Sequence, residues 1–139
     1  MLKPTIFLID DKLSNLIALE QHLESSEYEI EKYSTAIEAL PRMLLAPPHC
    51  VLVDCQLPEM NGIEFTRIVK ADPSLKDVPI ILITGKIYSE NQALAAVQAG
   101  AYEYLTKPLN PVLLKAKVSL LVDYARCKRY CQNQETSDS

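Results

Sequence analysis

The sequence predicts an α/β protein: a doubly wound, parallel sheet of five strands with five helices on its two faces. Short apolar runs rich in β-branched residues alternate with segments in which apolar residues recur at helical spacing. The alternation repeats five times within 139 residues, a length typical of one domain. Hydrophobic residues make up 48% of the chain and charged residues 23%, so there is enough apolar material to cover both faces of a sheet.

The first three predicted strands differ in their apolar pattern. Residues 5–9 and 50–54 are nearly continuous apolar runs, which is typical of parallel strands buried on both faces. Residues 28–32 alternate more weakly, so we expect this strand nearer the sheet edge. Residues 13–23 carry apolar side chains at helical spacing and form the first helix. Pro41 lies inside the second helix and is expected to kink or shorten it.

Polar residues and one glycine mark the ends of the predicted helices. Thr35 and Glu38 form a T-x-x-E capping box for the second helix, and Asn61 is placed to cap the third. Gly100 ends the fourth helix, and Asn110, which a proline follows, opens the last. These capping signals place the helix ends where the apolar pattern changes between helical and strand spacing.

The second half of the chain continues the alternation. Residues 80–83 form the fourth strand, residues 89–98 a helix of small residues, and residues 101–105 the fifth strand. The last helix is expected to continue past the domain, because Tyr124, Cys127 and Cys131 keep helical spacing. We therefore expect a domain over residues 1–123, and over residues 124–139 an extension of the last helix that ends in a disordered polar tail from residue 132.

Composition argues against several classes of function. The chain has 14 basic and 18 acidic residues, a formal charge of −4, whereas a nucleic-acid-binding module normally presents a basic surface. No run approaches the roughly 18 apolar residues of a membrane span. The first residues lack the apolar stretch of a secretory signal, so we expect a cytoplasmic protein.

The four cysteines do not form a recognisable framework. Cys50 and Cys55 bracket a predicted strand, while Cys127 and Cys131 lie one helical turn apart, and neither spacing is that of a zinc knuckle. We expect ordinary reduced thiols. His49 has no ligand-like neighbour in sequence and is predicted to lie in a loop.

The residues that follow the predicted strands suggest a site. Asp10 and Asp11 follow the first strand, Asp54 ends the third, Thr84 ends the fourth, and Lys107 follows the fifth. Ligands of open α/β sheets bind outside the carboxyl ends of the strands, where the strand order reverses, and in the order 2-1-3-4-5 the first and third strands flank that point. Two carboxylates about 4 Å apart repel by roughly 4 kcal/mol at an effective dielectric constant near 20, so the cluster favours a cation, and hard oxygen ligands suit Mg²⁺. An amine and a hydroxyl beside the cation suit a phosphoryl group.

These motifs together resemble the receiver domain of two-component response regulators. They are Asp10-Asp11, the segment from Asp54 to Gly62, Thr84-Gly85, and Tyr104 followed by Lys107-Pro108. The resemblance covers about residues 3–123 and has each motif in order at a strand end. It implies a flavodoxin-like fold with strand order 2-1-3-4-5.

The resemblance also implies roles for single residues. Asp54 would be the phosphoacceptor, whose carboxylate attacks a phosphohistidine of a partner. Asp11 and Asp54 would bind Mg²⁺ directly, with the backbone carbonyl of Gln56 as a third protein ligand and Asp10 acting through water.

Thr84 and Lys107 would hold the phosphoryl oxygens. Tyr104 would turn inward when Thr84 moves toward the phosphate, and the Lys107–Pro108 peptide bond would be cis. Phosphorylation would then change the face formed by the fourth helix, the fifth strand and the fifth helix.

The same resemblance implies the partners. A histidine kinase or a phosphotransfer protein would supply the phosphoryl group, and a homodimer through that changed face and an output domain beyond residue 139 are further expectations. Lys86 and Gln56 should lie at the mouth of the site, and we expect Lys86 to alter the lifetime of the aspartyl phosphate.

Two other functions use related chemistry or topology. A Mg²⁺-dependent aspartyl-phosphate hydrolase would place a second aspartate two residues after the nucleophile, where this chain has Gln56. An FMN-binding electron carrier would need a phosphate loop after the first strand, where Asp10 and Asp11 would repel the phosphate.

Overall fold

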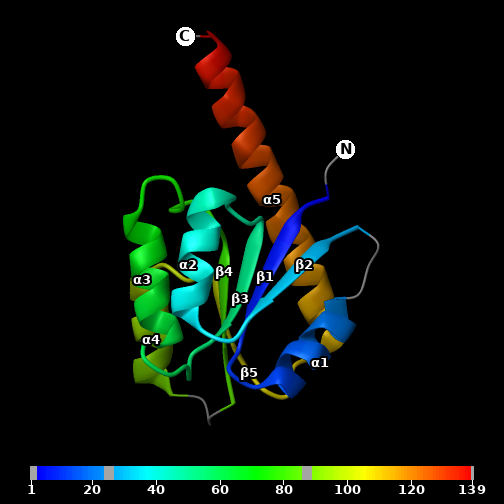
Figure 1. Ribbon diagram of the computed structural model, residues 1–139, viewed down its shortest axis with the longest axis vertical. Coiled ribbons are helices and arrows are strands. Elements are labelled where there is room, and N and C mark those ends of the chain that lie inside the picture. The colour runs from blue at the N-terminus through cyan, green and yellow to red at the C-terminus, as the bar shows by residue number, and fades with distance from the viewer. Residues whose placement is uncertain (1–2, 24–26, 86–88, 139) are drawn as a thin grey trace.

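The computed structural model describes residues 3–23, 27–85 and 89–138, and strands and helices alternate along the chain (Figure 1). The elements are β1 (Thr5–Ile9), α1 (Leu13–Leu23), β2 (Glu29–Tyr33), α2 (Ala36–Leu45), β3 (Cys50–Asp54), α3 (Gly62–Ala71), β4 (Ile80–Thr84), α4 (Glu90–Ala99), β5 (Glu103–Thr106) and α5 (Pro111–Asp138). The predicted fold class is confirmed, and the predicted strands agree with the observed ones to within two residues at either end.

The sheet has the strand order β2-β1-β3-β4-β5, and every pairing is parallel. The strands β3 and β4 are buried along their whole length, and β1 is buried except at its first residue. The edge strand β2 has only exposed and half-buried positions, in agreement with its weaker apolar pattern. The order reverses between β1 and β3, so their carboxyl ends flank the crevice in which such sheets bind ligands.

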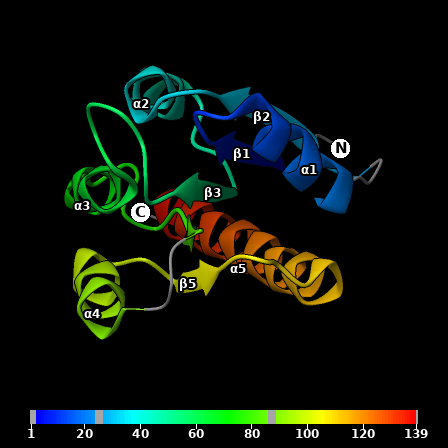
Figure 2. The ribbon, with the colours of Figure 1, turned by 90° about the horizontal axis from the view of Figure 1, so that it is seen from below.

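Helices cover the two faces of the sheet unequally, as the view from below shows (Figure 2). On one face, side chains of α1 and α5, such as Leu16 and Val118, pack against Leu8 and Leu52 of the strands. On the other face, α2, α3 and α4 cover a core that includes Phe7. Both faces of the central strands are therefore removed from water, which explains their continuous apolar sequence.

The predicted caps are present. The Thr35 hydroxyl accepts a hydrogen bond from the Glu38 amide (3.1 Å), and the Asn61 side chain accepts one from the amide of Glu64 (2.9 Å). Asn110 accepts bonds from the amides of two residues at the start of α5, and Gly100 ends α4 with a φ of 102°. By contrast, α2 continues through Pro41 to Leu45, so the proline does not end the helix.

The last helix differs from the prediction at its far end. It continues to Asp138, whereas the polar segment from residue 132 was expected to be disordered. Beyond the sheet, α5 projects past the amino ends of the strands (Figure 1). Three of its side chains bind loops at this edge: Arg129 binds the loop before β3, and Lys128 and Gln132 contact Asp77 before β4. Polar side-chain contacts therefore hold the extended part of α5 against the domain.

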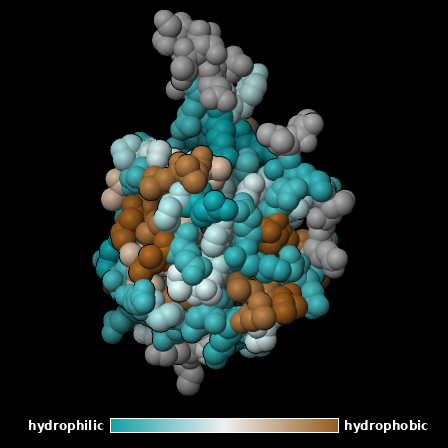
Figure 3. Space-filling view, in the orientation of Figure 1, coloured by the Kyte–Doolittle hydropathy of each residue, from teal (hydrophilic) through white to brown (hydrophobic). Residues whose placement is uncertain are grey.

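Exposed apolar side chains occur on both layers of the molecule. Figure 3 shows apolar surface over α2 and α3 and a separate area over α1, where Leu44, Leu45, Ile68, Leu13 and Ile17 are exposed. Among the described residues, no helix is both long enough and apolar enough to span a membrane. Apolar surface alone does not distinguish one part of the molecule as a site.

Candidate functional site

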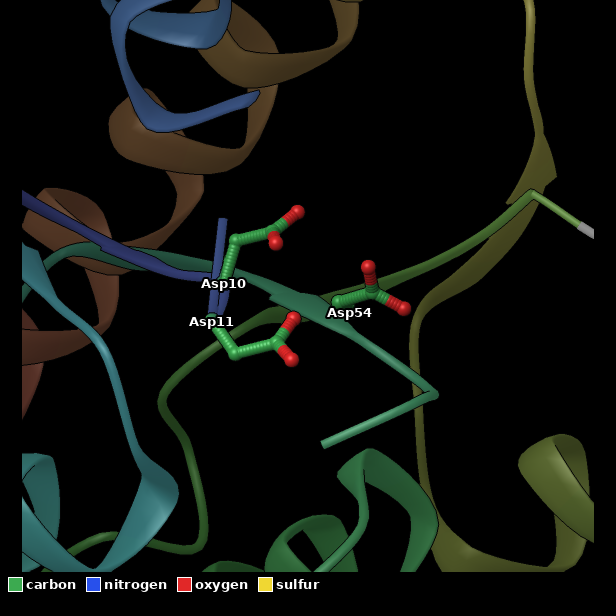
Figure 4. A group of neighbouring side chains, drawn as sticks. All are labelled: Asp10, Asp11 and Asp54. Atoms are coloured by element: carbon green, nitrogen blue, oxygen red, sulfur yellow. The ribbon is translucent and has the colours of Figure 1, made fainter. Parts of the chain in front are cut away.

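Three aspartates converge where the strand order reverses. Asp10 and Asp11 directly follow β1, and Asp54 is the last residue of β3; Figure 4 shows their side chains beside one another. One carboxylate oxygen from each lies within 4.8 Å of the others. Asp10 is 2% exposed and Asp54 8%, whereas Asp11 is exposed to solvent. The structure thus brings the predicted acidic residues together at one edge of the sheet.

Each buried aspartate is held by the backbone that follows it. The Lys12 amide donates to Oδ1 of Asp10 (2.9 Å), and the Gln56 amide donates to Oδ1 of Asp54 (2.8 Å). Both bonds span two residues and form Asx turns, which direct the chain away from the strand and fix the carboxylate. In each case the second oxygen, Oδ2, is directed toward Lys107.

Lys107 supplies positive charge to the cluster. Its Nζ lies 3.7 Å from Oδ2 of Asp10 and 3.8 Å from Oδ2 of Asp54. The Lys107 amide donates to the carbonyl of Thr84 (2.8 Å), which joins the segment after β5 to the end of β4, and the Lys107–Pro108 bond is cis, as expected. The amine is therefore placed between the two buried carboxylates by backbone contacts of its own segment.

The charges do not balance within this cluster. Burial raises the pKa of the Asp54 carboxyl, and the charge of Asp10 raises it further. The Gln56 amide and the Lys107 amine act in the opposite direction but do not cancel the increase. A negative charge on Asp54 is thus unfavourable in the folded protein, and a cation at the cluster would relieve it.

A close backbone approach positions the segment after Asp54. A Cβ atom on Gly62 would lie 2.6 Å from the carbonyl oxygen of Asp54 and 2.8 Å from Cδ2 of Leu82. The Gly62 amide donates to the carbonyl of Cys55 (3.2 Å), so the start of α3 is bound directly to the end of β3. Only glycine fits here without moving the backbone that carries Asp54.

Thr84 and Tyr104 lie on neighbouring strands. Thr84 is fully buried at the end of β4 and pairs in register with Thr106 of β5. Tyr104 is half-buried, and its hydroxyl donates to Oε1 of Gln92 on α4 (2.6 Å). Sequence analysis missed Gln92, because nothing local links a polar residue on one helix to a tyrosine on a strand. Lys86 lies outside the described residues.

The donor set fits a hard divalent cation. Three carboxylates can offer oxygen ligands within 4.8 Å of one another, and Asp11 faces solvent, so water has access. The residues present could therefore hold such an ion, with an amine and a buried hydroxyl nearby. This combination suits chemistry in which charge develops on phosphoryl oxygens.

Comparison with known proteins agrees with this chemistry. The family model described as the response regulator receiver domain matches residues 6–119. The chain is 31% identical to response regulator PleD of Caulobacter vibrioides over 86% of its own length and 26% of PleD. It is 30% identical to the phosphate regulon transcriptional regulatory protein PhoB of Pseudomonas aeruginosa over 88% of its own length and 53% of PhoB.

The solved structures agree on the fold. A CheY-like response regulator receiver domain protein from Methanospirillum hungatei superimposes with a TM-score of 0.81 at 28% identity, covering 91% of this chain and 99% of that one. The chain spans about a quarter of PleD and about half of PhoB. The chain therefore belongs to the response regulator receiver domains, the phosphoacceptor signalling switches of two-component systems.

Proposed function

We propose that Asp54 is the phosphoacceptor of this domain and that a Mg²⁺ ion at Asp10, Asp11 and Asp54 supports its phosphorylation. The supporting observation is the convergence of three carboxylate oxygens within 4.8 Å, with Lys107 facing two of them. Asp11 and Asp54 would hold the ion, with the backbone carbonyl of Gln56 as a further ligand and Asp10 in a supporting role through water. A bound ion would offset the charges of the carboxylates and of the incoming phosphoryl oxygens.

The transfer is a displacement at phosphorus. A carboxylate oxygen of Asp54 forms a bond to phosphorus while the phosphorus–nitrogen bond of a phosphohistidine breaks. The electron pair of that bond stays on the imidazole, which leaves and takes its proton from solvent. Lys107 binds a phosphoryl oxygen and stabilises the charge that develops there.

The switch uses Thr84 and Tyr104. The new phosphoryl oxygens attract the Thr84 hydroxyl, and the segment after β4 moves with it. Tyr104 then turns toward the space beside Thr84 and gives up its bond to Gln92 on α4. The face formed by α4, β5 and α5 thereby differs between the two states.

The proposed source of the phosphoryl group is a histidine kinase or a phosphotransfer protein. We also propose an output domain and a homodimer through the α4–β5–α5 face. Apart from its own phosphotransfer and dephosphorylation, the domain catalyses no reaction. Gln56, at the position where a hydrolase of aspartyl phosphates would carry its second aspartate, supports a stoichiometric acceptor over that enzyme.

Labelling with a small phosphodonor tests the assignment. In the presence of Mg²⁺ we expect one phosphoryl group per chain by intact mass, no labelling of Asp54→Asn, and slower labelling of Lys107→Ala. Asp123→Asn, an exposed aspartate on α5, is the matched control and should label like the parent. Normal labelling of Asp54→Asn, or sustained turnover of an external ester, would contradict the proposal.

Two further measurements refine it. Dephosphorylation of the parent and of Lys86→Ala should differ in rate; equal rates would remove the role proposed for Lys86. Solution size with and without beryllofluoride and Mg²⁺ reports whether the phosphorylated form pairs.

A further inference from the structure

The outer side of α5 carries two cysteines that the phosphotransfer chemistry does not use. Cys127 and Cys131 are free and exposed, whereas Cys50 and Cys55 are buried in the domain. Cysteine is among the residue types most often buried, so a pair of exposed thiols on one helix is unusual. Their spacing of four residues places both on the same side of the helix.

This spacing is suited to chelation. Side chains at positions i and i+4 of a helix have Cβ atoms about 5–6 Å apart, and the H-E-x-x-H motif uses the same spacing to bind zinc with two histidines. Thiolates bind Zn²⁺ at about 2.3 Å, and structural zinc sites have four protein ligands. One helix supplies two thiols, so a closed site needs two more from elsewhere.

The same side of α5 has the pattern of a helix that pairs with another helix. Its exposed residues recur at the alternating steps of three and four that are typical of a coiled coil, with the intervening position taken by Lys117, which is half-buried and pairs with Glu103 of β5 (2.6 Å). This outer stripe consists of Leu113 (57% exposed), Leu120 (70%), Tyr124 (48%), Cys127 and Cys131. The side of α5 that packs on the sheet is a different one, formed by Leu114, Val118, Leu121, Val122 and Ala125.

Contacts with the domain keep the stripe available. Arg129 binds the carbonyls of Pro47 and Pro48, which holds α5 against the amino edge of the sheet with its other side. Tyr124, Cys127 and Cys131 are all exposed, and the helix extends past them to Asp138. A second helix can therefore approach along the stripe without displacing a packed element of the domain.

The flanking charges favour a second copy in parallel orientation. In a parallel coiled coil, the residue just before Tyr124 faces, across the pair, the residue five positions later. Asp123 and Lys128 have this separation, and both are exposed, so each copy would place an acid opposite a base of the other; Lys128, 3.6 Å from Asp77 of its own chain, would then lie between two acids. Parallel two-fold pairing also sets each cysteine opposite its own counterpart, which gathers four thiols in two adjacent layers.

We propose that two copies of this chain pair in parallel through the outer stripe of α5 and that Cys127 and Cys131 of both copies bind one thiophilic divalent cation, with Zn²⁺ as the probe. Binding forms four sulfur–metal bonds, and each thiol gives up one proton to solvent. The ion joins the two helical extensions at the end of the molecule opposite to Asp54.

The test measures molar mass and metal content of the full chain under a non-thiol reductant, with excess Mg²⁺ to occupy the acidic cluster. We expect Zn²⁺ to double the mass with one ion bound per two chains, and a chelator to reverse it. Co²⁺ should give the sulfur-to-metal charge-transfer and tetrahedral visible bands that carboxylate ligands do not produce. A chain that stays monomeric with Zn²⁺, or Co²⁺ bound without these bands, would overturn the proposal.

Variants separate the thiols from the stripe. The double variant Cys127→Ser with Cys131→Ser should lose the charge-transfer band and the zinc-dependent doubling, and Leu120→Glu should lose the doubling. Lys115→Ser, an exposed change on another side of α5, should behave like the parent. Far-ultraviolet circular dichroism and labelling of Asp54 report that each variant is folded. A dimer that survives the chelator and disappears only with stronger reduction is a disulfide and contradicts the metal site.

Discussion

The two edges of the sheet both concentrate charge, but they satisfy it differently. At the carboxyl edge, three carboxylates lie close together. Among the described residues, Lys107 is the cation that contacts two of them, Asp10 and Asp54. At the amino edge, the guanidinium of Arg129 donates to the carbonyls of Pro47 and Pro48, and its Nη1 lies 2.9 Å from Nε2 of His49. Negative charge is therefore in excess at the carboxyl edge, where a ligand is expected. At the amino edge, the positive charge of Arg129 is satisfied by neighbouring groups that stabilise the fold.

This difference separates function from stability. A cluster of buried like charges destabilises the fold until a cation binds, whereas a half-buried arginine with neutral acceptors stabilises it. The amino edge also keeps His49 uncharged. Its Nδ1 accepts a hydrogen bond from the Thr5 amide (3.1 Å), and burial together with the charges of Arg129 and Arg126 lowers the pKa of His49 to about 4.

The largest expected effect is that of Mg²⁺ on the carboxyl edge. At a free concentration of 100 times its Kd, Mg²⁺ should raise the free energy of unfolding by about 2.7 kcal/mol. Asp11→Asn and Asp54→Asn should lose most of this gain, because each removes a ligand. Denaturant titrations with and without Mg²⁺ measure it, and equal stabilisation of parent and variants would place the ion elsewhere.

Breaking the amino edge comes next. Arg129→Ala should lower the free energy of unfolding by about 2 kcal/mol, because it removes charge-assisted hydrogen bonds to two carbonyls. The labelling rate of Asp54 should not change. Arg126→Ala, on the exposed side of the same turn, is the control and should stay within about 0.5 kcal/mol of the parent. A loss of labelling in Arg129→Ala would show that the two edges are coupled.

Removing one charge at the carboxyl edge should have a smaller effect of the opposite sign. The raised pKa of Asp54 means that the fold disfavours its ionised form relative to the unfolded chain. Without Mg²⁺, Asp54→Asn should therefore raise the free energy of unfolding by about 1 kcal/mol. Asp123→Asn should leave it unchanged. Destabilisation by Asp54→Asn would indicate that the contact with Lys107 outweighs the repulsion from Asp10.

The smallest effect concerns pH. Because the pKa of His49 is lowered from 6.5 to about 4 in the fold, the unfolded chain takes up the proton first as the pH falls. The contribution of His49 to stability is therefore complete above pH 6.5 and is lost toward pH 4 and below. After allowance for solvent screening, the change should be about 1 kcal/mol or less. Unfolding of the parent and His49→Gln across this range measures it, and His22→Gln should keep the pH dependence of the parent.

Much of the fold and of the acidic cluster could be predicted from local sequence. Continuous apolar runs identify β1, β3 and β4, because a strand covered on both faces has no polar side. Parallel strands bring their carboxyl ends to one edge, so Asp10, Asp11 and Asp54 had to meet once the strand order was fixed. The caps at Thr35 and Asn61 depend on contacts between near neighbours and were equally accessible.

The amino edge could not be predicted in this way. His49 and Arg129 are separated by 80 residues, and their contact depends on where α5 passes the loop before β3. The end of α5 is a related case: composition alone favoured disorder from residue 132, whereas the helix continues to Asp138 and Gln132 bonds to Asp77, 55 residues away. The bond between Tyr104 and Gln92 likewise joins a strand to a helix across the layer.

By itself, the sequence of this protein determined which segments become buried strands and which acids stand at their ends, because periodicity and strand termination are local properties of a chain. Only the tertiary structure decided which charges are compensated. The distance from Lys107 to Asp54 and the enclosure of Arg129 both depend on how separate elements pack, and that packing follows from the shape of the whole core.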